Sequence, residues 1–207
     1  MAEVLKKFWK RQADSVLPKI GAKAASWWDE DRWNEELADD LEPVINDVAD
    51  SHGKEVADAI GSRYEPKMTR NYLRALALGR AVAINASTYK KLEEAQLAED
   101  QTPQAVMERR QTTDSISFGR MLANGVAGWA ATHEAPQQAL QQGVNKIVEK
   151  EWVTGDNPRQ SHALMNGEVV PISEPFSNGA MWPGDDILDA DESCGCNCST
   201  QVIITEV

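Results

Sequence analysis

The sequence predicts an α+β fold in which a mainly helical body, residues 1–150, precedes a small loop-rich module, residues 151–207. Apolar residues recur at helical spacing through the body, and little of it is typical of a strand. After residue 153 the turn sequences GDNP, MNGE, SNG and WPGDD follow one another closely. The chain then ends in TQVIITEV, a β-branched run typical of a strand. This change of composition predicts the boundary between body and module.

The first predicted helix, residues 1–20, is amphipathic and basic. Its apolar positions, which recur with helical spacing, are Val4, Leu5, Phe8, Trp9, Val16, Leu17 and Ile20. Residues 1–23 carry six lysines and arginines against two acidic residues, whereas the whole chain has a net charge of −12. Such an acidic chain is unlike a general nucleic-acid binder. Contact with DNA is therefore expected only through this basic helix, and a simple solvated helix face is the alternative.

Acidic helices are predicted from there to about residue 98. Asp29 is the expected N-cap of a helix with an acidic first turn, and Pro43 predicts a helix boundary or kink within the following pattern. A third helix is expected over residues 66–85, and Ser87 or Thr88 is expected to cap a fourth.

Further helices are predicted over residues 103–150. The first of them has Thr102 as its N-cap and Pro103 in its first turn. The sequence contains no apolar run of eighteen residues and no signal-peptide core at its start. Neither a membrane span nor export is therefore expected, and the predicted setting is a reducing cytoplasm.

All three cysteines, Cys194, Cys196 and Cys198, occupy alternate positions near the end of the chain. Three thiols cannot all pair within one chain, so a disulfide framework is not expected. Together with His162 they offer the donor set of a four-coordinate zinc site. The spacing is unusual for zinc, because C-x-C in an extended strand holds the thiolates too far apart unless Gly195 kinks the backbone.

Two other interpretations of these residues remain open. In a catalytic one, a cysteine is activated by His162, whose imidazole is oriented by Asp156. In a structural one, Asp156, Arg159, His162 and Asp185 pin the loops, while the small thiols fill the face of a strand. The residues alone favour the structural interpretation, since the same residue types recur in many proteins that are not enzymes.

An ordered series in the last fifty-five residues resembles the C-terminal module of the phage Mu F-like family of minor head proteins. The series is KEW, D-x-x-R-x-x-H, N-G-x-x-V-P, P-F, W-P-G-D and a glutamate before C-x-C. The residues that carry the resemblance are Lys150, Trp152, Asp156, Arg159, His162, Asn166, Gly167, Val170, Pro171, Pro175, Phe176, Pro183, Gly184, Asp185, Glu192, Cys196 and Cys198. In this register Cys194 departs from the pattern, because an apolar residue is usual at its position. A register two residues earlier, in which Cys194 and Cys196 are the C-x-C pair, stays open as an alternative.

Two segments upstream are also similar to the family, though less closely. Glu134 takes the place of the glutamate in a family helix, with His133 at a threonine position. Residues 8–45 are similar to the helical segment that precedes this module where it is fused behind portal-type proteins.

The resemblance implies a component of the virion head or procapsid, found in the host cytoplasm during assembly. Its implied role is head morphogenesis at the portal vertex, in DNA packaging or genome ejection, with portal or major capsid protein as partner. No reaction is indicated, and a non-enzymatic protein is favoured. The competing class is an enzyme or toxin-like effector that uses the Asp, Arg, His and Cys residues of the module.

Overall fold

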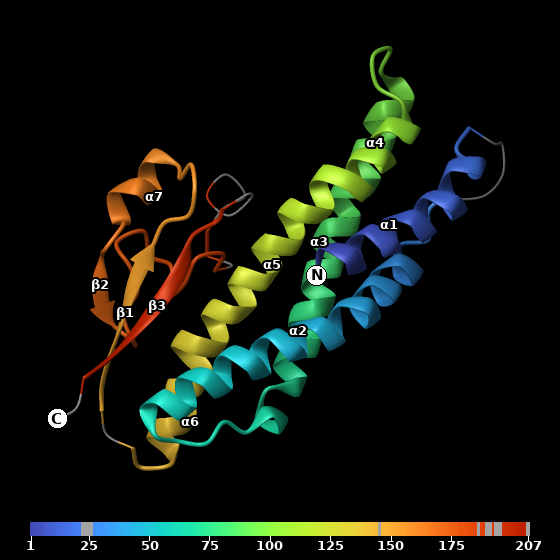
Figure 1. Ribbon diagram of the computed structural model, residues 1–207. Coiled ribbons are helices and arrows are strands. Elements are labelled where there is room, and N and C mark those ends of the chain that lie inside the picture. The colour runs from blue at the N-terminus through green and yellow to red at the C-terminus, as the bar shows by residue number, and fades with distance from the viewer. Residues whose placement is uncertain (22–26, 145, 186, 189–191, 193–195, 206–207) are drawn as a thin grey trace. The chain divides into compact units, whose positions relative to one another are not determined.

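The computed structural model describes residues 1–21, 27–144, 146–185, 187–188, 192 and 196–205 (Figure 1). Its fold is α+β, as the sequence predicts: long helices come first, and a three-stranded antiparallel sheet forms near the C-terminus. None of the described helices is both long and apolar enough to span a membrane.

The chain divides into two compact units. Unit 1 comprises residues 1–44 and 71–119, and unit 2 comprises residues 45–70 and 120–207. Helices α2 and α5 contribute residues to both units, and α3 contributes its first residue, Arg70, to unit 2. Unit 2 therefore contains the sheet and also helical residues that come well before the sheet in the sequence. The predicted domain boundary near residue 150 stays a prediction.

Helix α1 (Ala2–Val16) confirms the predicted amphipathic helix and ends in a 3-10 turn, Leu17–Lys19. Its apolar stripe belongs to the core of unit 1, since Leu5, Phe8, Trp9 and Val16 are fully buried. A stripe of this size contributes several kcal/mol of transfer free energy, on the order of 2 kcal/mol for each large side chain. Helix α1 is thus an integral part of unit 1 and not a detachable arm.

Helix α2 (Glu30–Ile60) begins as predicted but does not stop at the proline. The Asp29 carboxylate accepts a hydrogen bond from the Arg32 amide at 3.2 Å, which is the expected N-cap. The predicted helix boundary at Pro43 is wrong, because Pro43 lies inside one continuous helix. Leu41 and Ile45 on either side are fully buried, so their burial outweighs the one hydrogen bond that proline cannot make.

Helix α3 (Arg70–Leu97) is also longer than predicted, and a short 3-10 turn, Pro66–Met68, precedes it. The predicted caps Ser87 and Thr88 both lie inside this helix. The Thr88 hydroxyl instead donates to the Ile84 carbonyl at 2.8 Å, which satisfies a buried polar group without ending the helix.

The next helical stretch runs through α4 (Pro103–Arg109), α5 (Ser115–Trp129) and α6 (Ala135–Gln141). The predicted cap is confirmed, because the Thr102 hydroxyl accepts from the Ala105 amide at 3.2 Å. π-Helical turns at Arg110–Asp114 and Ala130–Glu134 join these helices.

Strand β1 (Ile147–Val153) corrects the prediction that helix continues to residue 150. Helix α6 ends before Gly143, whose φ of +78° lies in the left-handed region that favours glycine. Lys150 and Trp152 then alternate as the fully buried residues of the strand.

Strand β1 is the centre of the sheet. It pairs antiparallel with β2 (Val169–Pro171) on one side and with β3 (Ser199–Thr205), the predicted C-terminal strand, on the other. Helix α7 (Gln160–Met165) lies between β1 and β2 in the chain. The small core of this region consists of Trp152, Met165, Phe176, Ala180, Cys196 and Cys198.

Candidate metal centre

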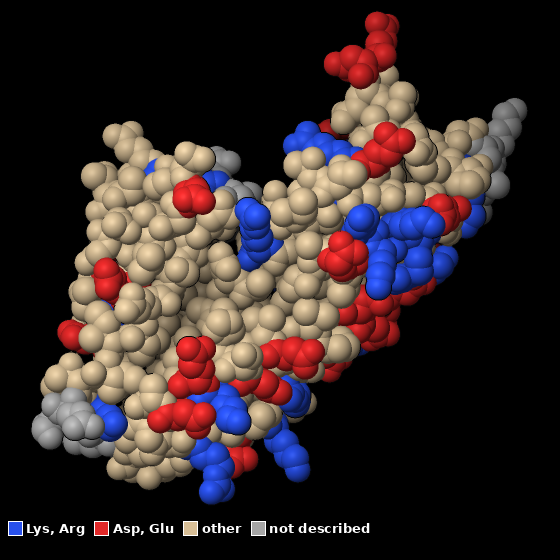
Figure 2. Space-filling view, viewed as in Figure 1, with Lys and Arg blue, Asp and Glu red and all other residues tan. Residues whose placement is uncertain are grey.

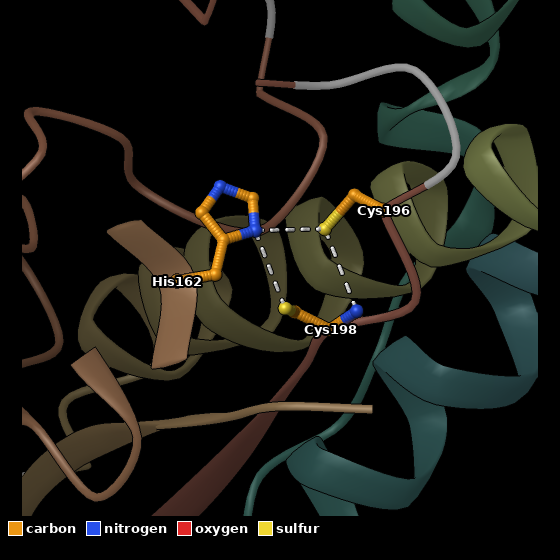
Figure 3. Close-up of side chains that lie close together, drawn as sticks. All are labelled: His162, Cys196 and Cys198. Atoms are coloured by element: carbon orange, nitrogen blue, oxygen red, sulfur yellow. Dashed lines mark hydrogen bonds between the residues drawn. The ribbon is translucent and has the colours of Figure 1, made fainter. Parts of the chain in front are cut away.

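His162, Cys196 and Cys198 come together in unit 2 with their polar atoms facing one another (Figure 3). Nδ1 of His162 lies 3.5 Å from Sγ of Cys196 and 3.5 Å from Sγ of Cys198. The three atoms all lie within 4.8 Å of one another, and all three residues are buried. The described residues therefore hold a His-Cys-Cys group with the donor types that zinc prefers.

The backbone before β3 brings the two sulfur atoms to one side. Residues 196–198 precede the strand, and the Cys198 amide donates to Sγ of Cys196 at 3.4 Å. The separation expected of C-x-C in an extended strand therefore does not apply. Gly155, which follows β1, donates its backbone N–H to the Cys198 sulfur and so holds the second thiol from the other side.

Helix α7 supplies His162. The Asn166 side chain, just after α7, accepts hydrogen bonds from the Thr154 amide and hydroxyl, both at 3.0 Å, which fastens the helix to the end of β1. The Trp152 ring packs edge-on against the imidazole, with the ring centroids 5.3 Å apart. Imidazole and indole together exclude water from this side of the group, since both rings are buried.

Glu192 lies behind the imidazole. Its Oε2 is 2.7 Å from Nε2 of His162, the ring nitrogen that faces away from the sulfur atoms. The Ser161 hydroxyl donates to the same carboxylate at 3.1 Å, and Arg159 donates to the Glu192 backbone carbonyl at 3.4 Å. The catalytic interpretation gave the orienting role to Asp156, but Asp156 is an exposed residue. The only signal for Glu192 in the sequence is its place in the ordered series before the cysteines.

The pKa values of the two thiols are shifted in opposite directions. A hydrogen bond from the Cys196 thiol, with a further one from the Gly155 amide, lowers the pKa of Cys198 to about 5 although burial opposes the change. The hydrogen bond to Cys198, together with burial, raises the pKa of Cys196. Cys198 is thus the more acidic thiol of the pair, and a metal ion would displace the protons of both thiols on binding.

The remaining predicted residues lie in other places. Cys194 is outside the described residues. The Asp185 carboxylate accepts from the Met181 and Ile187 amides at 2.8 and 3.3 Å, so it holds a separate turn together. Arg159 contacts the segment that carries Glu192. Within the predicted structural cluster, Arg159 and His162 thus both contact Glu192, whereas Asp185 serves a separate turn.

The space beside the sulfur atoms is narrow. It does not admit a water molecule, and it is lined by Met121, Asn124, Pro183 and Gly184 as well as by both cysteines. Asn124 of α5 closes it further by donating to the Cys198 carbonyl at 3.2 Å. A site enclosed in this way suits a structural metal ion better than a reaction on a substrate.

Comparison of the chain with protein-family models, with curated proteins and with solved structures finds no match. The functional interpretation therefore depends on the ordered series of residues and on where the fold places them. Trp152 and Phe176 of that series belong to the small core together with Cys196 and Cys198, and the two cysteines form the buried group with His162.

Proposed function

We propose that this chain is a phage minor head protein that acts in head morphogenesis at the portal vertex. Its site of action is the virion head or procapsid, assembled in the host cytoplasm, and its partners are portal or major capsid protein. The observation that supports this is a coincidence between sequence and fold. Five of the residues that carry the resemblance to the Mu F-like family lie in the small core or in the His-Cys-Cys group: Trp152, His162, Phe176, Cys196 and Cys198.

The test is incorporation into particles. Procapsids assembled from the portal and major capsid proteins encoded with this chain are expected to retain it through gradient purification when portal protein is present. Omission of the portal protein is expected to remove it. A chain that stays entirely in the unassembled fraction would contradict the proposal.

A contact with DNA, or with an acidic portal surface, is proposed for the exposed face of α1. Figure 2 shows Lys and Arg side chains gathered over α1, beside acidic side chains of α2. Arg11 is engaged by Asp40, whereas Lys6, Lys7 and Lys10 are exposed. The three lysines therefore carry the charge that remains for a partner.

Charge removal tests this contact better than deletion, because α1 belongs to the core of unit 1. Replacing Lys6, Lys7 and Lys10 by Gln is expected to weaken binding to a DNA duplex, most strongly at low salt. The dependence of binding on salt should fall by up to about three counterions. The matched control replaces three exposed lysines elsewhere, Lys54, Lys67 and Lys90. Equal binding by both triple variants would remove the basic face from the proposal.

We also propose that the buried His-Cys-Cys group holds a structural zinc ion, with His162, Cys196 and Cys198 as ligands and Cys194 as the fourth ligand predicted from sequence. The zinc would join α7 to the segment before β3, and it would supply stability, since these elements share only a small core. Elemental analysis of the purified chain is expected to find one zinc per chain.

Substitution separates the ligands from neighbouring thiols. Cys196→Ser and Cys198→Ser are each expected to abolish zinc binding, and chelation of the wild-type chain is expected to lower its unfolding temperature. Cys194→Ser decides the predicted fourth ligand independently of the other two. A wild-type chain that binds no zinc when purified under reducing conditions would exclude the metal centre.

The alternative function, an enzyme or toxin-like effector, is favoured by one observation. A thiol of lowered pKa, an imidazole and a carboxylate follow one another in Cys198, His162 and Glu192, as in a nucleophile, base and orienting group. A nucleophile must be reached, however, and Cys198 is only 2 % exposed. Rapid labelling of Cys198 by a thiol reagent in the folded chain would favour the enzyme; slow labelling supports the structural role.

A further inference from the structure

We propose that Glu192 is a positioning residue that keeps a proton on Nε2 of His162 and thereby aims Nδ1 at the two cysteine sulfur atoms. This inference deepens the zinc site proposed above, because it identifies the ring nitrogen that binds the ion and the group that selects it. Glu192 itself does not contact the ion: it lies on the opposite side of the imidazole from Cys196 and Cys198.

The geometry of the imidazole carries the proposal. Its two nitrogens face different partners. Nε2 lies 2.7 Å from the Glu192 carboxylate. Nδ1 lies 3.5 Å from both sulfur atoms (Figure 3). Nε2 is buried and makes no aligned hydrogen bond, and the Glu192 carboxylate 2.7 Å away needs only a small turn to accept one. Because a carboxylate only accepts hydrogen bonds, the proton of that bond belongs on Nε2. The imidazole then offers its Nδ1 lone pair to a metal ion held between the sulfur atoms.

Glu192 is itself held in place, as an orienting group must be. The Ser161 hydroxyl lies 3.1 and 3.3 Å from its two carboxylate oxygens, and Arg159 anchors its backbone carbonyl. Ser161 precedes His162 in α7, so two adjacent side chains of this helix, Ser161 and His162, contact the Glu192 carboxylate. The imidazole is 1 % exposed, and its ring has little freedom to turn over.

The first measurement needs no metal. In a ¹H–¹⁵N correlation spectrum of the full chain under reducing conditions, His162 is expected to show a proton on Nε2 that exchanges slowly with water. Glu192→Ala should speed this exchange or abolish the signal, whereas Glu192→Gln, whose amide oxygen still accepts, should preserve it in part. Glu174→Ala, at an exposed glutamate of the same unit, is the control and should leave it unchanged. An Nε2 without a proton in the wild-type chain would overturn the proposal.

The second measurement uses zinc itself. Competition with a chromophoric chelator is expected to show an affinity about 10- to 100-fold lower for Glu192→Ala than for the wild type, with a smaller loss for Glu192→Gln. Unchanged affinity, or identical losses for Glu192→Ala and the Glu174 control, would refute the positioning role. If the wild-type chain binds no zinc, the zinc proposal fails, while the Nε2 signal still decides whether Glu192 positions the imidazole.

Discussion

Gly155 and Asn197 approach so closely that a Cβ atom added to Gly155 would lie 2.4 Å from the Asn197 carbonyl oxygen. The end of β1 thus passes directly against the residue between the two buried cysteines. This contact also places the Gly155 amide at the Cys198 sulfur, where it lowers the pKa of that thiol. Glycine is required here for space, because only a residue without a side chain leaves room for the backbone of the cysteine segment.

Gly155→Ala is therefore expected to destabilise unit 2 by about 1 to 3 kcal/mol, the usual cost of forcing an extra carbon into a packed region. Zinc affinity should fall as well, because the segment that carries both thiols must move. Urea unfolding and zinc competition measure the two effects. The control is Gly79→Ala in α3, where an added Cβ meets open space; a gain of about 0.5 to 1 kcal/mol is expected there. A Gly155→Ala chain as stable as wild type would contradict the steric role.

The buried Lys150 is expected to make the chain more stable as the pH rises above about 8. Burial, opposed by Asp185, lowers the pKa of its ammonium from 10.5 to about 8, and Nζ has the Met181 carbonyl at 2.9 Å. Between about pH 8 and pH 10.5 the unfolded chain binds a proton that the folded chain has lost. The contribution of Lys150 to the free energy of unfolding should therefore increase through this window, by about 3 kcal/mol at most, and stay constant below it.

Lys150→Met isolates this contribution, since methionine has a similar volume and no charge. Urea unfolding of both chains at several pH values should give a difference that changes only above about pH 8. Tyr64, whose pKa burial raises to about 12, contributes an opposite trend above pH 10 but contributes it equally to both chains. Parallel pH curves for the two chains would show that Lys150 does not titrate as predicted.

Local sequence signals correctly predicted a cap or a strand where the residue types involved favour a single kind of structure. The caps Asp29 and Thr102 and the strand β3 are such cases. Strand β1 was missed because one of its two fully buried residues is Lys150, so the inward face does not alternate by hydrophobicity. The polar residue Thr88 was read as a cap for a related reason: burial and a hydrogen bond to a carbonyl within the helix let it remain in the middle of α3.

The candidate site could also be predicted only in part, because its contacts join residues far apart in the sequence. The residue types of His162, Cys196 and Cys198 pointed to a metal site, and the fold brings those three together. Glu192 was recognisable only as a member of the ordered series, because its contact with His162 joins residues thirty positions apart. Donor chemistry was thus predictable from sequence, whereas the group that orients the donor depends on tertiary structure.

Substitution of Asn85 is expected to lower the stability of unit 1. Its side-chain oxygen accepts from the Gln12 amide at 3.1 Å and its nitrogen donates to Asn34 at 3.0 Å, inside the core formed by α1, α2 and α3. Asn85→Ala leaves both partners without these bonds in a buried place, so a loss of about 2 to 5 kcal/mol is expected from urea unfolding. The control is Asn71→Ala on the exposed side of α3, expected within about 0.5 kcal/mol of wild type. A small effect at Asn85 would mean that water replaces the lost partners.

A second large loss of stability in unit 1 is expected from substitution of Arg110. Its guanidinium is fully buried between the Trp9 and Phe118 rings, at 5.5 and 5.3 Å from their centroids, and it bonds Asp114 at 3.1 Å and Ser87 at 2.8 Å. Arg110→Ala leaves the Asp114 carboxylate in the core with no buried cation, and a loss of about 3 to 5 kcal/mol is expected.

A double-mutant cycle separates the pair from its packing. Arg110→Met with Asp114→Leu removes both charges and keeps the volume, and this chain should recover most of the stability that Arg110→Met alone loses. Arg109 also reaches Asp114, at 3.3 Å, but its side chain is 65 % exposed, so water screens its contribution. Urea unfolding of the four chains gives the coupling energy. Additive losses would show that the guanidinium acts through its stacking on Trp9 and Phe118 and not through Asp114.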